Sequence, residues 1–307
     1  MFGFGKYNYE AFTKDMLEKD LETESFGGPE AGERAPDFEA RTLDGDKVRL
    51  SDFEGEKNVV LTFGSATCPM TAGSLSGIND LQQEYDPDDV QFLFVYVREA
   101  HPGDELPAHS SMEEKVRAAE LLRSEEEVDL PIIVDDVRGN IHRRYSRLPN
   151  PTFIIDKSGR VAFRCKWTQP DVVEKALDEL LERQEERDVE HAIVNGGENS
   201  SMPLTYAMLY AHRALDRGGR KAKQDFRDAL GIRGTLALAA SRVAEPIALN
   251  PGKTLAGVAL TGGVIAGAVY LGRQLRNRRF AARGPYRVHG GIRPSDTVGG
   301  DYEAVGI

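Results

Sequence analysis

Cysteine is scarce in this sequence, with Cys68 and Cys165 the two examples among 307 residues. Two thiols are too few for a disulfide scaffold or a cysteine-rich zinc module. The six histidines also lack the spacing of metal ligands, so we expect no metal site. Five histidines receive no predicted role: His109, His142, His191, His212 and His289.

Positive charge is also in deficit. Lys and Arg total 39 against 50 acids, a net charge of −11, which argues against a general nucleic-acid binder. The deficit is uneven, because the segment from Arg213 to Arg287 has 15 basic residues and 4 acids, a net of +11. The remainder then carries −22. A reversal this sharp indicates two physically different parts of the chain.

Strand and helix patterns alternate through the acidic part. Val59–Phe63 is a nearly continuous apolar run, typical of a strand that is covered on both faces. Asp44-Gly45 is a hairpin signal between two short strands. The alternation predicts an α/β sandwich around a mixed sheet. The expected strands are 37–41, 47–50, 59–63, 90–97, 130–134, 152–156 and 161–166, and the expected helices are about 69–85, 112–122, 140–146 and 170–187.

Cys68 lies just after the Val59–Phe63 strand, at the start of a predicted helix. Pro69 suits the first helical position, where its missing N–H would be unpaired anyway. Unpaired N–H groups and the partial positive charge of a helix N-terminus stabilise a thiolate. We therefore predict a reactive thiol, with a small buried hydrophobe as the alternative.

Two segments resemble the thioredoxin-like (redoxin) superfamily. Gly32–Phe38 (GERAPDF) resembles the entry motif of redoxin domains, and Asn150–Asp156 (NPTFIID) resembles the segment that carries their cis-proline. The resemblance covers about residues 32–184. It implies a thioredoxin-like sandwich. In this chain we expect a mainly helical C-terminal extension after the sandwich. It also implies that Pro151 is cis and faces Cys68.

Two further strings resemble the iodothyronine deiodinases. Phe63–Pro69 (FGSATCP) resembles their active-site segment, which has selenocysteine at the Cys68 position, and Phe94–Pro102 (FVYVREAHP) resembles their second signature. This resemblance implies that Cys68 is the nucleophile, His101 the proton donor and Glu99 an acidic partner. Residues expected to support the site are Ser65, Thr67, Pro69, Thr71, Pro151 and Thr152.

The sequence departs from that family in its thiols. Cysteine replaces selenocysteine, and Ala66 stands where vertebrate members have a cysteine that could resolve an oxidised intermediate. A dithiol motif would need a second cysteine three residues after Cys68, and the sequence has Thr71 at that position. Cys165 is expected on the apolar face of an edge strand. We therefore expect a single thiolate that reacts with a small-molecule or thiol substrate. An external thiol, and no cofactor, would regenerate it.

Two other functions stay open. A one-cysteine peroxiredoxin would have Thr at the Ser65 position, Pro at Leu61 and Arg near Asn150, so one weak match in three supports it. A membrane-tethered binding or scaffold protein with a catalytically idle redoxin fold is the second alternative.

The longest uncharged run is Thr254–Gly272, 19 residues that would form a helix of about 28 Å against a hydrocarbon core of about 30 Å. Ala259, Gly263 and Gly267 form a small-residue stripe of the kind found in packed membrane helices. We predict a transmembrane helix with self-association through this stripe. A buried soluble helix and a flexible segment remain alternatives, because five glycines weaken helix propensity.

The membrane orientation is contradictory on sequence grounds. Arginines after the run favour a cytoplasmic C-terminal end, which would place the redoxin domain on the outside of the membrane. Met1–Lys19, however, lacks the apolar core of the signal peptide that export of that domain would need. We expect a membrane-associated protein with a cytoplasmic redoxin domain. The predicted organisation is an N-terminal extension (1–31), a redoxin domain (32–187), a helical basic linker (188–253), the transmembrane helix (254–272) and a basic then disordered tail (273–307).

Overall fold

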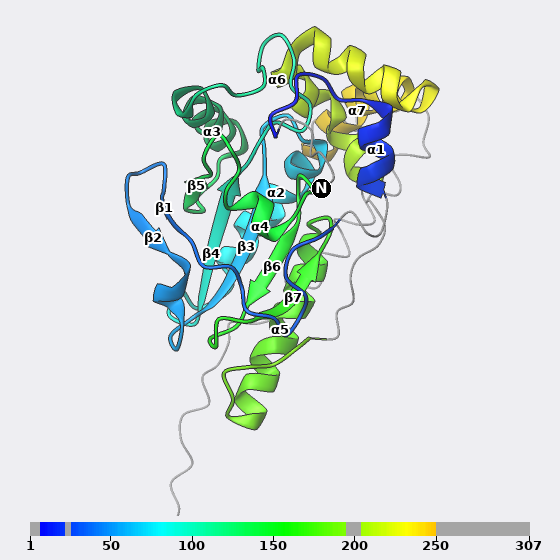
Figure 1. Cartoon of the computed structure of the whole chain (residues 1–307). Coiled ribbons are helices and arrows are strands. Elements are labelled where there is room, and N and C mark those ends of the chain that lie inside the picture. The colour runs from blue at the N-terminus through cyan, green and yellow to red at the C-terminus, as the bar shows by residue number, and fades with distance from the viewer. Residues whose placement is uncertain (1–6, 22–25, 195–203, 250–307) are drawn as a thin grey trace, which may run out of the picture. The chain divides into compact units, whose positions relative to one another are not determined.

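A computed structural model of the chain describes residues 7–21, 26–194 and 204–249 (Figure 1). The centre of the fold is a five-stranded sheet in the order β5-β4-β3-β6-β7. β3 runs parallel to β4 and antiparallel to β6, while β4 is parallel to β5 and β6 antiparallel to β7. The strands are β3 (Asn58–Gly64), β4 (Val90–Tyr96), β5 (Ile132–Val134), β6 (Thr152–Ile155) and β7 (Val161–Cys165). This mixed sheet confirms the predicted thioredoxin-like sandwich.

Both faces of the sheet are covered. All seven residues of β3 are buried, and they alternate between two apolar clusters: Val60 points to one, and Val59 and Leu61 to the other. The first cluster includes α2, α3 and α5, and the second includes α4 and residues beside the β1–β2 hairpin. These elements are α2 (Pro69–Gln82), α3 (Met112–Glu126), α4 (His142–Tyr145), α5 (Pro170–Arg187), β1 (Glu39–Arg41), β2 (Lys47–Arg49) and the 3-10 turn η2 (Leu50–Phe53).

The N-terminal segment supplies one further helix, α1 (Lys14–Leu21). None of its residues is buried, and Leu21 is exposed. Phe12 is buried instead, just before the helix. The apolar anchors of this extension therefore flank α1, with Phe12 before the helix and Phe26 after it.

A helical extension follows the sandwich, as predicted. It comprises α6 (Leu204–Leu230) and α7 (Ile232–Leu249), and α6 packs against both α2 and α7 (Figure 1). At Gly219 α6 is broken, with φ 85° and ψ −160°. Glycine tolerates this backbone conformation without steric cost, so Gly218-Gly219 divides the helix into two halves.

The first half of α6 is tied to the turn before α2. The Arg217 guanidinium donates to the Ala66 carbonyl (3.0 Å) and to the carboxylates of Glu125 (2.6 Å) and Glu126. The side chains of Arg217 and Glu126 are each 3% exposed. Gly103 lies against Gly218, where a Cβ on Gly103 would stand 1.9 Å from the Gly218 carbonyl oxygen. This close approach requires glycine at position 103.

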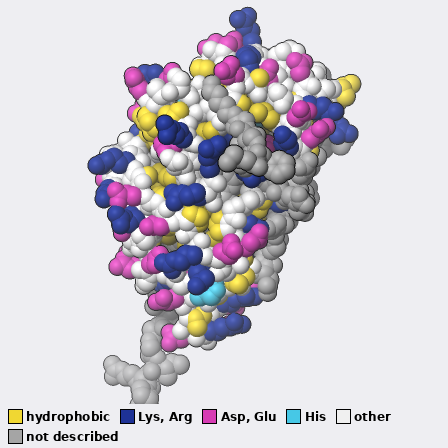
Figure 2. Space-filling view, in the orientation of Figure 1, with side chains coloured by type: hydrophobic (Ala, Val, Ile, Leu, Met, Phe, Trp, Pro, Cys, Tyr) yellow, Lys and Arg dark blue, Asp and Glu magenta, His cyan; other side chains and the backbone are white. Residues whose placement is uncertain are grey.

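One face of the described residues shows no separation of charge. On the face seen in Figure 2, basic and acidic side chains are interspersed. No helix within residues 7–21, 26–194 and 204–249 has the length and hydropathy needed to cross a bilayer. The predicted transmembrane helix 254–272, its stripe of Ala259, Gly263 and Gly267, and the tail 273–307 lie outside the described residues.

Arg217→Ala tests the attachment of α6. Removing one partner of a buried pair leaves the Glu126 carboxylate without compensation, so the free energy of unfolding should fall by about 3–5 kcal/mol in a urea titration. Arg220→Ala on the same helix is the control, because the Arg220 side chain is 97% exposed and should change stability little. Equal losses in the two variants would contradict the buried attachment.

Candidate active site

Cys68 occupies the junction between the central strand and its following helix. β3 ends at Gly64, and Cys68 is the N-cap of α2 in extended backbone conformation (φ −90°, ψ 117°). Pro69 is the first helical residue, where the chain needs no N–H donor. The sequence therefore predicted this strand–Cys–Pro–helix arrangement correctly.

The electrostatic environment of the thiol differs from the prediction. Burial raises the pKa of Cys68 to about 11, since its residue is 1% exposed. Hydrogen bonds from the backbone and hydroxyl of Thr71 and from the backbone of Met70 lower the pKa but do not outweigh burial. The Thr71 hydroxyl oxygen accepts from the Ser65 N–H (3.3 Å), so its proton is left for the sulfur. In this closed form the group is a thiol.

Glu99 forms a buried hydrogen-bond network beneath the active-site turn. One carboxylate oxygen accepts from the Thr67 N–H (2.9 Å) and the Thr67 hydroxyl (2.7 Å). The other accepts from the Tyr96 hydroxyl and lies 3.0 Å from Nε2 of His109. The Tyr96 oxygen in turn accepts from the Ala66 N–H (3.3 Å). Glu99 thus connects the end of β4, the turn and the loop before α3.

The network keeps Glu99 ionised. Burial by itself would raise its pKa, but the hydrogen bond and charge of His109, with hydrogen bonds from Tyr96 and Thr67, lower the pKa below its ordinary value. The histidine ring that bonds to Glu99 is that of His109, not that of His101. His109 has no role predicted from the sequence, because a histidine within a polar loop offers no spacing signal. Tyr96, read as a strand residue, was also missed.

His101 lies in the same region with a different environment. Its backbone N–H donates to the Thr67 hydroxyl (3.0 Å), and its ring is held between Phe12 and Phe226 at centroid distances of 4.3 and 5.4 Å. Nδ1 of His101 has no hydrogen-bond partner among the described residues. Burial lowers the pKa of His101 to about 3, against a raising effect of Glu99. The ring is therefore neutral, below the pKa range expected of a proton donor near neutral pH.

The predicted supporting residues divide into two groups. Ser65 lies at the turn, where its hydroxyl accepts from the Ala100 N–H (3.2 Å), and Thr67 and Thr71 make the contacts described above. Thr152 belongs elsewhere: its hydroxyl bonds those of Thr62 (3.0 Å) and Thr168 (2.8 Å). Thr152 is also paired with Cys165 in the β6–β7 register.

The predicted cis bond at Pro151 is wrong. The described residues contain no cis peptide bond, so Pro151 is trans. The segment before β6 continues the sheet instead. The Pro151 carbonyl accepts from the Phe63 N–H (3.0 Å) and the Asn150 carbonyl accepts from the Thr168 N–H (2.9 Å). An extended trans chain makes both bonds.

Cys165 lies on the edge strand β7, as predicted. It is fully buried, and burial raises its pKa to about 12. Cys165 belongs to the apolar cluster on one face of the sheet, and Cys68 to the cluster on the other face. Both cysteines are free thiols.

Comparison with known proteins identifies relatives of the sandwich. The family model for iodothyronine deiodinase matches residues 13–185, more than half of the chain. A thyroxine 5-deiodinase from Gallus gallus is 36% identical over 143 residues, which are 43% of this chain and 55% of that protein. A type I iodothyronine deiodinase from Xenopus laevis is 27% identical over 172 residues, covering 53% of this chain and 66% of that protein. The chain thus spans between half and two thirds of these relatives.

Solved structures of similar fold include redox proteins. The exposed lipoprotein thioredoxin Etrx1 from Streptococcus pneumoniae has a TM-score of 0.36 and 27% identity, and covers 47% of this chain and all of that chain (100%). The peroxidoxin BcpB from Mycobacterium tuberculosis has a TM-score of 0.37 and 21% identity, and covers 49% of this chain and 95% of that chain.

The protonation state of Cys68 can be measured without chemical access to the sulfur. In cysteine-labelled protein with Cys165→Ala, the ¹³Cβ shift of Cys68 should stay that of a thiol from about pH 6 to pH 9, because ionisation requires pH to approach the raised pKa of about 11. Thr71→Val should raise the pKa further, and Thr71→Ser, which keeps the hydroxyl, should not. A midpoint below that of free cysteine, about 8.5, would contradict the closed, protonated form.

Proposed function

Because this chain belongs to the iodothyronine deiodinase family, we propose that it is a thiol-dependent oxidoreductase that reductively removes iodine from a small iodinated phenol. The observation that carries the proposal is the placement of one cysteine, Cys68, at the N-cap of α2 directly above the Glu99 network. The names of the relatives point to thyroxine as one substrate to test.

The proposed reaction needs one protein thiol and two external thiols. The Cys68 thiolate attacks the iodine atom, so that an S–I bond forms, the C–I bond breaks and the ring carbon takes a proton. An external thiol then attacks the sulfur, releasing iodide and a proton and forming a mixed disulfide. A second external thiol frees Cys68 and leaves as the oxidised disulfide. The substrate is reduced and the two external thiols are oxidised.

The Glu99 network supports the proton transfers of this scheme. Its members are joined by hydrogen bonds from His109 through the carboxylate to Thr67, the residue before Cys68. The ionised carboxylate of Glu99 can accept a proton and pass it on without carrying a second charge into the buried site. His101, on the other side of Thr67, is a neutral imidazole and serves substrate positioning better than proton donation in the closed form.

Access to Cys68 requires movement of the segments that cover the turn. Phe12 and Phe226 enclose His101, and Arg217 fixes α6 to Ala66. Opening these contacts would remove the burial that raises the Cys68 pKa. The hydrogen bonds from Thr71 and Met70 would then favour the thiolate. Substrate entry and activation of the nucleophile are coupled in this proposal.

We also propose, from the sequence, that the protein associates with a membrane through 254–272. The redoxin domain would then lie on the cytoplasmic side, and the small-residue stripe would mediate self-association. It rests on the uncharged run and its basic flanks.

Iodide release tests the reaction. The full chain should release iodide from iodinated phenols in the presence of a dithiol, Cys68→Ser should abolish release, and Cys165→Ala should retain it, because the two thiols lie on opposite faces of the sheet. The intact mass of the protein after exposure to iodinated phenols and to peroxide shows whether Cys68 has been modified, and so separates a deiodinase-like enzyme from a peroxidase and from an idle binding protein. Oxidation by peroxide without iodide release would establish a one-cysteine peroxidase instead, and no change with either would leave an idle binding protein.

Glu99→Gln tests the network separately. The substitution keeps the shape and removes the charge, so kcat should fall by about 10²–10⁴ with little change in KM. Asp156→Asn is the matched control, since Asp156 is also a fully buried carboxylate paired with a histidine, His191, but follows β6 away from the turn. Equal loss in both variants would indicate a general effect on folding and remove Glu99 from the mechanism.

A further inference from the structure

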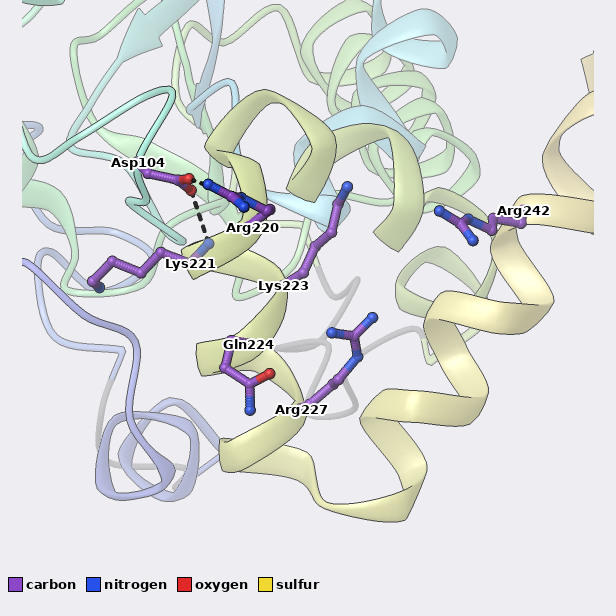
Figure 3. A pocket seen from close by; sticks show the side chains of 7 residues that line it. All are labelled: Asp104, Arg220, Lys221, Lys223, Gln224, Arg227 and Arg242. Atoms are coloured by element: carbon purple, nitrogen blue, oxygen red, sulfur yellow. Dashed lines mark hydrogen bonds and ion pairs between the residues drawn. The ribbon is translucent and has the colours of Figure 1, made fainter.

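A cavity of about 680 Å³ lies beside the second half of α6, facing α7 (Figure 3). The side chains of Lys223 and Arg227 on α6 and of Arg242 on α7 point into the space between the two helices (Figure 3). Five of the seven lining residues are cationic and one is acidic. They are Asp104, Arg220, Lys221, Lys223, Gln224, Arg227 and Arg242.

The helix pair has its own apolar core, which fixes this arrangement. Phe226 and Ala222 of α6 pack with Ala237 and Leu238 of α7, all of them buried. Lys223 and Arg227 are four residues apart, so they lie on one face of α6. The packing of the two helices therefore sets the separation between Arg227 and Arg242.

Nearby acids neutralise part of this cationic cluster. Asp216 pairs with Lys223, Asp225 with Lys221, and Asp104 with Arg220. Among the residues whose side chains the structure describes, which end at Arg242 on α7, no carboxylate pairs with Arg227 or Arg242. Two guanidinium groups thus line the cavity, and no described side chain supplies a carboxylate counter-ion to either of them.

The potential in the cavity is positive. Burial lowers the pKa of Lys223, and the charges of Arg242 and Arg227 lower it further. Burial also lowers the pKa of His212, and Arg242 and Lys223 add to that effect. Asp216 pairs with both Lys223 and His212. Even so, the neighbouring cations of α6 and α7 disfavour the protonated forms of these two side chains. An added anion would relieve this repulsion.

We propose that the space between α6 and α7 is a binding site for a phosphate-bearing anion, with Arg227 and Arg242 as its two guanidinium donors and Lys223 as a third cation. Guanidinium groups match the oxygens of phosphate in paired hydrogen bonds, which favours phosphate over a single-point anion. The volume exceeds that needed by a lone phosphate and fits a phosphate ester with an organic group. This site does not depend on the proposed reaction at Cys68.

Two sources could supply the same chemistry. One is a soluble phosphate ester. The other is an anionic phospholipid headgroup, which the sequence allows because α7 ends at Leu249, just before the uncharged run that begins at Thr254. The experiment separates them with two probes on the full chain: inorganic pyrophosphate in solution, and phosphatidylcholine vesicles with or without phosphatidic acid.

The test compares two double variants that remove the same charge. Arg227→Gln/Arg242→Gln should weaken pyrophosphate affinity at least tenfold in calorimetry, about 1.4 kcal/mol. The control, Arg187→Gln/Arg233→Gln, removes two exposed arginines outside the cavity and should bind as the wild type does. Circular dichroism should show both folded.

The outcomes decide both existence and source. Loss of pyrophosphate binding in Arg227→Gln/Arg242→Gln, but not in the control variant, supports the site with a soluble ligand. Loss of co-sedimentation with vesicles that contain phosphatidic acid, again in Arg227→Gln/Arg242→Gln but not in the control, supports the site with a lipid headgroup as its ligand. Wild-type protein that binds neither probe, or equal weakening in the two double variants, would overturn the proposal, because the second result means general electrostatic attraction.

Discussion

The ionised carboxylate of Glu99 is the interaction on which the active-site region depends. A buried charge is costly unless every lone pair finds a donor, and here the donors come from three separate segments: Tyr96 at the end of β4, Thr67 in the turn and His109 before α3. Satisfying the charge therefore fixes the turn relative to the sheet. The position of Cys68, one residue beyond Thr67, follows from that attachment.

The segments outside the sandwich determine the state of the thiol. The helix N-terminus and the donors of Thr71 and Met70 favour a thiolate, but burial dominates because the turn is covered. Part of that cover is α6, held by the Arg217 link to Ala66, and part is the residues before α1, where Phe12 meets His101. The reactivity of Cys68 is thus a property of the whole described chain and not of the strand–turn–helix motif alone.

Local sequence features predicted the elements well, because their signals are local. The Val59–Phe63 run, the Asp44-Gly45 turn and the Cys68-Pro69 junction each need only neighbouring residues. The errors concern tertiary contacts. Pro151 is trans, and its carbonyl and that of Asn150 accept hydrogen bonds from the Phe63 and Thr168 N–H groups, which lie outside the local motif. The partner of Glu99 is ten residues away in a polar loop, and the raised Cys68 pKa comes from covering segments, so neither had a local signal.

The break at Gly219 explains how one helix takes part in two environments. Before it, α6 is attached to the sandwich, with Arg217 buried against Glu126 and Ala66. After it, the helix turns its cations toward α7 and solvent. A continuous helix would carry one periodic face through both halves, whereas the glycine backbone at φ 85° lets the second half take a different direction from the first. The described part of this basic segment is therefore not a uniform basic surface: Arg217 is neutralised against the sandwich, whereas Lys223, Arg227 and Arg242 line the cavity between α6 and α7.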